Sequence, residues 1–186
     1  KGTIQMITSP LTVIEKGWLT FLSWMTDKQK QDCIQQVGID ITLDRCFMVD
    51  SSVVAVLSEN GRKFKPVAEM VPHTEDGFYN LHQGYNYDWS SDFTVNVPED
   101  RCALIVVRSS LNRVGGGITS GIFDPNFVGS VAGALRLFAG SVNIERHARI
   151  AQIIFIKAES ATQYNGIYNN LDTPKHWAEQ VVGMGT

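Results

Sequence analysis

The sequence predicts a mainly all-β domain, a sandwich or barrel, on two observations. Beyond Val37, short runs rich in β-branched residues alternate with breaks of glycine, proline or polar residues. Little of the chain has a helical pattern, and no low-complexity stretch divides it. With 186 residues, of which 44% are hydrophobic, the chain can bury one sizeable core. We therefore expect a single domain over residues 1–186.

An N-terminal extension, residues 1–36, is expected to precede the β core. Residues 11–25 are apolar, but Glu15 and Lys16 interrupt them and they are too short to span a bilayer. A buried or interfacial segment is the better interpretation. Thr26 or Asp27 can cap a helix that runs toward Cys33. The extension should thus contain one short helix.

The β core is expected over residues 37–157. Its expected strands are Ile39–Leu43, Val53–Leu57, Phe64–Met70, Phe93–Val97, Ala103–Val107, Val131–Leu137 and Ile150–Ile156. The Asn60-Gly61 pair predicts a tight hairpin turn between two strands. Strand periodicity is lost from Ala158 onward, so residues 158–186 are expected to form an irregular tail that wraps over a surface or a neighbouring subunit.

Composition excludes several classes of function. A formal net charge of -3 gives no global attraction to nucleic acid, and no segment predicts a membrane partner. Three widely spaced cysteines make a poor disulfide framework, which favours a reducing, cytoplasmic setting. The four histidines have no metal-ligand spacing, and a zinc deaminase signature is missing from the sequence.

A run that begins at Arg108 is typical of an anion site. The guanidiniums of Arg108 and Arg113 can hold phosphate oxygens as planar forks, and the Ser109 and Ser110 hydroxyls can complete the cradle. Three glycines follow at 115–117, which favours a formed loop. The sequence therefore predicts a phosphorylated ligand, with Asp124 as the nearby carboxylate.

Three ordered motifs carry a resemblance to a known family. They are Arg108-Ser109-Ser110-Leu111-x-Arg113-x-Gly115, Thr119-x-Gly121-x-x-Asp124-Pro125-x-Phe127-x-Gly129 and Arg149-Ile150-Ala151-Gln152. Over roughly residues 34 to 170 the chain resembles the dCTP deaminase and dUTPase superfamily. The resemblance implies a distorted antiparallel β-barrel or jelly-roll-like fold and a homotrimer with active sites at subunit interfaces. It also implies dUTP or dCTP as the ligand, with Mg2+ on the triphosphate.

The resemblance also assigns roles to residues. Asp124 would activate a water for attack on the α-phosphorus, although it could instead only cap the turn before Pro125. Phe127 would lie against the deoxyribose. Triphosphate and other substrate contacts would come from Arg108, Ser109, Ser110, Arg113, Thr119, Gln152 and Tyr164. Asp40 would reach Mg2+ through water, or else be a strand-end residue, and Gln152 could equally be a hydrogen-bonded strand residue.

Two departures from the family pattern bear on the reaction. Deaminases carry a proton-shuttling glutamate ten residues beyond the aspartate, where this chain has Ala134. Ile167 replaces a lysine of the deaminase-type tail. We therefore expect hydrolysis of dUTP to dUMP and pyrophosphate. Deamination of dCTP, alone or combined with hydrolysis, is one alternative, and a nucleotide-binding or interaction module without turnover is another.

Overall fold

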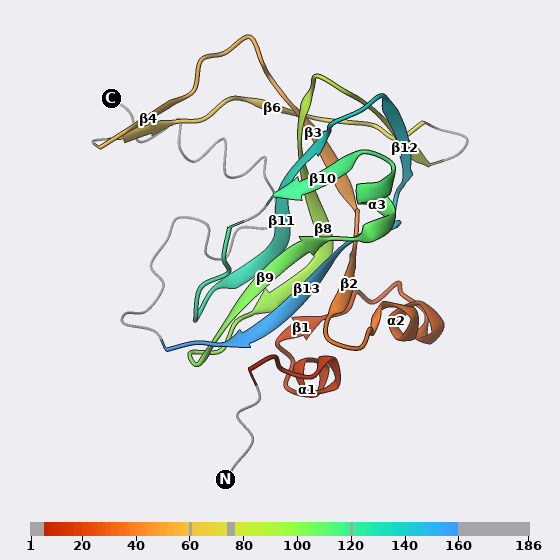
Figure 1. Ribbon diagram of the computed structural model, residues 1–186, viewed down its shortest axis with the longest axis vertical. Coiled ribbons are helices and arrows are strands. Elements are labelled where there is room, and N and C mark those ends of the chain that lie inside the picture. Colours follow the sequence, from red (N-terminus) through yellow and green to blue (C-terminus); the bar gives the residue numbers. More distant parts are fainter. Residues whose placement is uncertain (1–5, 60, 74–76, 120, 160–186) are drawn as a thin grey trace.

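The structure is a computed structural model that describes residues 6–59, 61–73, 77–119 and 121–159 (Figure 1). Most of its elements are strands. The helices are α1 (Pro10–Glu15), α2 (Asp27–Cys33) and α3 (Ser109–Arg113). The strands are β1 (Leu19–Thr20), β2 (Ile39–Thr42), β3 (Arg45–Val49), β4 (Val56–Ser58), β5 (Gly61–Lys63), β6 (Val67–Glu69), β7 (Phe78–His82), β8 (Asn86–Asn96), β9 (Arg101–Val107), β10 (Gly116–Thr119), β11 (Val128–Leu137), β12 (Ser141–Glu145) and β13 (Arg149–Lys157).

The largest sheet is antiparallel and has the strand order β10-β11-β8-β3-β6, with β1 also paired to β8. Its long central strands alternate between two environments. On β8, Tyr87 and Trp89 are buried, while Asp88 between them is only partly covered. On β11, Val131 and Leu135 are buried in the core. One face of this sheet therefore packs inward, and the other carries more polar and smaller side chains.

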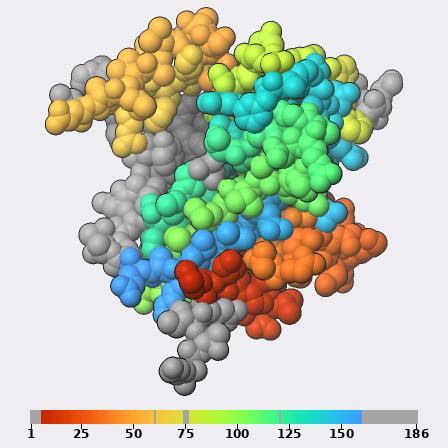
Figure 2. Space-filling view, viewed as in Figure 1, coloured from red at the N-terminus to blue at the C-terminus, as the bar shows by residue number. Residues whose placement is uncertain are grey.

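A second antiparallel sheet has the order β2-β13-β9. Ile153 and Phe155 of its central strand belong to the same hydrophobic cluster as Trp89 and Val131 of the large sheet, so the two sheets share one core. Strands β12 and β7 form one further pair, and β4 and β5 form another. The β4–β6 segment projects at the upper left of the molecule, far from α1 at the bottom (Figure 2).

The all-β prediction is confirmed. Among the described residues the strand ladders form separate sheets rather than a closed barrel. No helix in the described part of the chain is long and apolar enough to cross a membrane. The irregular tail expected over residues 158–186 lies almost entirely outside the described residues.

The pairing of β8 with β11 contains an irregularity that matters for the site. Ser130 pairs with Thr94, whereas Ala132, two residues further, pairs with Ser90, four residues back along β8. Strand β8 therefore carries two more residues than β11 across this interval. Beyond the irregularity the ladder is regular again, and Ala134 pairs with Asp88.

Several expected elements are confirmed and others are corrected. The predicted helix is α2, and Thr26 caps it in a reciprocal capping box with Gln29. The expected strand Val53–Leu57 is wrong in its bounds, because only Val56–Ser58 forms a strand. The loop expected after Arg108 is also wrong, because Ser109–Arg113 forms α3 and Gly116–Thr119 forms β10. Buried Leu111 anchors this short helix to the core.

Candidate functional site

A cavity of about 940 Å³ lies over the β8–β11 face that carries Asp88 and Ala134. This volume is in the range of small-molecule sites. One part of the lining comes from Val49, Ala55, Phe64, Lys65 and Val67, and another comes from Thr119, Gly121, Ile122, Phe123, Asp124 and Phe127. Most of the residues that line the cavity are apolar, so the few charged side chains that reach it are the candidates for specific contacts.

Asp124 lies at this cavity on a tight turn that leads into β11. The Phe127 amide donates to the Asp124 carbonyl oxygen at 3.1 Å, and Asn126 between them has a φ of 67°. Proline at the second position and a left-handed residue at the third are the marks of a type II turn, and asparagine tolerates this conformation well. The Asp124 side chain is exposed, so the turn presents its carboxylate to the cavity rather than burying it.

Phe127 closes the same turn and is buried, with its ring in edge contact with Phe123 at 5.2 Å between centroids. Both rings line the cavity. The Asn126 amide and the Phe127 carbonyl oxygen are tied to the backbone of Val97. The Phe127 ring is thereby fixed at the cavity, beside the turn that carries Asp124.

Thr119, Ala134 and Asp88 form a row across three strands. Thr119 pairs with Ala134 in the β10–β11 ladder, and Ala134 pairs with Asp88 in the β11–β8 ladder. Direct partners in antiparallel strands point to the same face and have Cβ atoms about 5 Å apart. All three residues line the cavity. The small Ala134 side chain thus lies between a hydroxyl and a carboxyl.

Asp88 is the most perturbed of the charged groups in the cavity. Burial raises its pKa to about 6, and the positive charge of Arg136 partly opposes this. Arg136 is two residues beyond Ala134 on β11 and also lines the cavity. A carboxyl with a pKa near neutrality can exchange a proton or change its hydrogen-bonding role within the physiological range.

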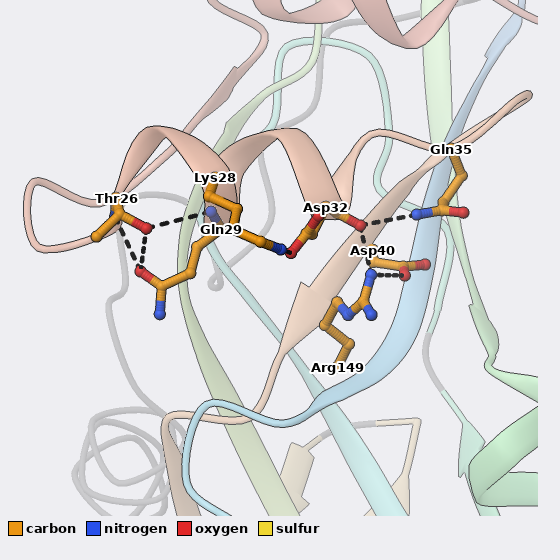
Figure 3. Close-up of polar contacts among 7 residues, drawn as sticks. All are labelled: Thr26, Lys28, Gln29, Asp32, Gln35, Asp40 and Arg149. Atoms are coloured by element: carbon orange, nitrogen blue, oxygen red, sulfur yellow. Dashed lines mark hydrogen bonds and ion pairs between the residues drawn. The ribbon is translucent and has the colours of Figure 1, made fainter.

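A second group of candidate residues surrounds Asp40 on the other sheet. Asp40 is fully buried, with its carboxylate 3.1 Å from Arg108 Nε and 3.3 Å from Arg149 Nη1. Gln152, its direct partner on β13, donates to it at 3.2 Å. Figure 3 shows Arg149 extended between Asp40 and the carbonyl oxygen of Asp32 at the end of α2. Burial raises the pKa of Asp40, whereas Arg108, Gln152 and Arg149 act in the opposite direction.

The expected phosphate-binding residues are thus of two kinds. Arg108 is half-buried and directed at Asp40, and its Nη1 also donates to the Arg149 carbonyl oxygen at 3.1 Å. Ser109, Ser110 and Arg113 are exposed on α3. None of these four lines the cavity that contains Asp124. Tyr164 lies outside the described residues.

The buried oxygens of Asp40 contact two arginines and an amide. The expected contact of Asp40 to Mg2+ through water stays a prediction. Elsewhere in the described chain, Asp44, Asp92 and His147 lie close enough together to suggest a cation site. However, the guanidinium of Arg146 contacts Asp44 at 2.6 and 2.9 Å, and a cation would have to compete with it.

Residues 23–158 match the family model described as dCTP deaminase-like. The chain belongs to this family. Among relatives of the family, it is 29% identical over 143 residues to a deoxyuridine 5′-triphosphate nucleotidohydrolase of Methanocaldococcus jannaschii, an alignment that covers 76% of this chain and 90% of the relative. It is 30% identical over 139 residues to a probable deoxyuridine 5′-triphosphate nucleotidohydrolase of Methanopyrus kandleri, with 74% and 88% coverage.

A solved family structure supports the fold. The crystal structure of 2′-deoxycytidine 5′-triphosphate deaminase from Agrobacterium tumefaciens superposes with a TM-score of 0.62 at 14% identity. The match covers 82% of this chain and 48% of that one, so the chain spans about half the length of the solved protein. At this identity the likeness establishes the dCTP deaminase-like fold alone, and the roles of individual side chains are argued from their geometry.

Three charged residues of the cavity, Lys65, Asp88 and Arg136, were missed from the sequence. Asp88 and Arg136 lie on strands whose alternate residues are buried, at the positions that point away from the core. A signal for Asp88 was available, because a carboxylate between the apolar Tyr87 and Trp89 marks the other face of the strand. Its position beside Ala134 was not available, since that depends on the pairing of β8 with β11.

Proposed function

We propose that this dCTP deaminase-like protein hydrolyses dUTP to dUMP and pyrophosphate. The observation that carries the proposal is the exposed Asp124 carboxylate, presented by a type II turn to a cavity of nucleotide size beside the Phe127 ring. The relatives named as dUTP nucleotidohydrolases support the same substrate.

In the proposed reaction Asp124 accepts a proton from a water molecule. The water oxygen attacks the α-phosphorus in line, the bond from that phosphorus to the bridging oxygen breaks, and pyrophosphate leaves with the bonding electrons. Phe127 and Phe123 form the apolar wall for the deoxyribose, and Thr119 is a polar contact across β10. Mg2+ enters the proposal as part of the substrate, held by the triphosphate and water.

The proposal includes a homotrimer in which each site uses residues from two copies. Ser109, Ser110 and Arg113 are exposed, yet they lie outside the Asp124 cavity of their own chain. A second copy can bring these donors to the triphosphate, with Arg108 held in place by Asp40. Tyr164 and Gln152 remain proposed contacts. All three cysteines are free thiols, which favours the reducing, cytoplasmic setting that we propose. We also propose that residues 1–186 form one domain.

One assay tests the hydrolysis. The protein is incubated with dUTP, dCTP or dTTP plus Mg2+, and pyrophosphate, monophosphates and ammonia are measured together. We expect pyrophosphate from dUTP and a loss of about 10²- to 10⁴-fold in kcat for Asp124→Asn, because a positioned proton acceptor is removed. Asn preserves the turn, which uses the backbone of residue 124. Glu99→Gln, which changes an exposed carboxylate that does not line the cavity, is the control.

The assembly has its own test. Light scattering should give three copies, and Asp124→Asn mixed with Arg113→Ala during refolding should recover activity that neither variant has alone. An inactive wild-type protein, or Asp124→Asn with full activity, would contradict the hydrolase. Nucleotide binding without any product would instead identify a binding module. Ammonia from dCTP would identify the deaminase alternative.

A further inference from the structure

Asp88 is a carboxyl that the proposed hydrolysis does not use. It is partly buried in a mainly apolar cavity, and no hydrogen bond or ion pair to its side chain is formed within the described residues. Placing such a group away from water without a partner is unfavourable. The cavity is also where the nucleotide would lie, so a ligand group is the natural partner for this carboxyl.

The position of Asp88 indicates which part of a nucleotide it would meet. Asp124 enters the cavity from the turn before β11, whereas Asp88 enters it opposite the middle of that strand, beside Ala134. If the α-phosphorus lies at Asp124 and the sugar against Phe127, the nucleobase continues along β11 toward Asp88. The short Ala134 side chain leaves space for a base edge to approach the carboxyl.

We propose that the Asp88 carboxylate accepts a hydrogen bond from the ring N3–H of uracil and so selects uracil over cytosine. The N3 atom of cytosine has no hydrogen and presents a lone pair, which a carboxylate repels. A site built around a substrate N–H discriminates strongly against an analogue that lacks it, because the buried acceptor is then unpaired. This role deepens the proposed function and rests on it for the orientation of the nucleotide.

The proposal makes base selection depend on pH. Burial raises the pKa of Asp88 to about 6, so the group is mostly ionised above neutrality and mostly protonated near pH 5. The charged groups that line the cavity with it are Arg136 on β11, and Lys65 and Asp124 at the cavity wall. On β3 its direct partner is Phe47, and the buried Cys46 lies on the opposite face of the sheet. Once protonated, Asp88 can donate to cytosine N3 and no longer prefers uracil.

Binding measurements test this without requiring turnover. Affinities for dUMP and dCMP are measured by calorimetry near pH 5 and near pH 7.5 on the full chain. For the wild type, the ratio of uracil to cytosine affinity should rise about tenfold or more with pH, the size expected for one well-placed base contact. Asp88→Asn, which keeps the shape, should remove the pH dependence. Asp88→Ala should lower the ratio near pH 7.5, and Glu99→Gln should behave as the wild type.

The outcomes separate this inference from the hydrolase proposal. Pyrophosphate release from dUTP together with an Asp88→Asn ratio that follows the wild type at both pH values overturns the role of Asp88 and leaves the hydrolase standing. Absence of pyrophosphate together with a ratio that depends on Asp88 overturns the hydrolase and supports the base contact. A ratio that falls as pH rises also overturns the inference, because the carboxylate would then favour cytosine. Circular dichroism of each variant checks that it is folded.

Discussion

Asp88 and Ala134 are direct cross-strand partners in the β8–β11 ladder, and both line the cavity that contains Asp124. At the Ala134 position a deaminase is expected to carry its glutamate. The carboxyl group of this chain therefore lies one strand away from the expected position, on the same face of the sheet. The carboxyl that we propose binds the uracil base, Asp88, is thus the direct neighbour of the position where the glutamate is missing.

A glutamate placed at position 134 should conflict with Asp88. We expect Ala134→Glu to destabilise the protein by about 1 kcal/mol near pH 7.5, because like charges on directly opposed strand residues repel. In an Asp88→Asn background, the same substitution should lower the free energy of unfolding by a smaller amount. Urea unfolding of the four proteins gives the coupling energy. Ser130→Glu, opposite the uncharged Thr94, is the matched control, and equal coupling at both positions would refute the contact.

Removing the charge at position 88 should stabilise the protein at high pH. The folded-state pKa of about 6 lies above the ordinary aspartate pKa of 3.8, so the folded chain binds the proton more tightly than the unfolded chain. Stability that Asp88 contributes is therefore present below about pH 4 and is lost as pH rises through about 6. The free energy of unfolding of Asp88→Asn should therefore be higher than that of the wild type by on the order of 2 kcal/mol near pH 7.5. Near pH 4 the two free energies should be equal.

Unfolding curves at the two pH values check this expectation. Glu99→Gln should show no such pH-dependent difference from the wild type, since it lies on an exposed turn. A variant at position 88 that is less stable than the wild type near pH 7.5 would mean that the ionised carboxylate is paired in the folded protein.

The buried Asp40 should be a structural requirement. Asp40→Asn removes the negative charge that faces Arg108 and Arg149, and we expect a loss of about 3 kcal/mol in the free energy of unfolding. Chemical denaturation measures it. Asp32→Asn is the control, because the exposed ion pair of Asp32 with Lys28 should contribute little. Similar effects of the two substitutions would show that the Asp40 cluster is not a stabilising network.

A side chain at position 38, which is glycine, should destabilise the protein. A Cβ atom there would lie 2.7 Å from the carbonyl oxygen of Ile153 and 2.8 Å from Cγ of Gln152, and the backbone oxygen is fixed within β13. Gly38→Ala should therefore cost about 1–3 kcal/mol through overpacking. In contrast, a Cβ atom at Gly61 would contact nothing within 4 Å. Thermal unfolding of Gly38→Ala and Gly61→Ala compares them, and equal midpoints would contradict the close approach.

Local patterns predicted a large part of the fold. The capping residues of α2 and the β-branched runs of β2, β9, β11 and β13 depend on neighbours in sequence, and these elements occur where expected. The interrupted runs of β3 and β7 were missed, because their strand state depends on pairing with distant strands. The helix α3 was missed because the buried contact of Leu111, rather than a clear helical pattern, stabilises it.

Part of the candidate site was also predictable. The turn from Asp124 to Phe127 is local, and its Pro-Asn pair already indicates the geometry that presents the carboxylate. The partners of Asp40 were not predictable, because Arg149 follows it by 109 residues and meets it only through the pairing of β2 with β13. The same limit applies to Asp88, which reaches the cavity through a long-range strand register.

Between the Ser130–Thr94 and Ala132–Ser90 pairs, β8 has two more residues than β11. These additional residues decide which side chain lies opposite Ala134. If the pairing of Ser130 with Thr94 continued without interruption, Ala134 would face Ser90, and Asp88 would face Arg136. Since side chains alternate with a period of two, such a shift would leave the buried and exposed faces unchanged. The register of β8 against β11 thus decides whether Ala134 lies opposite a carboxyl or a hydroxyl.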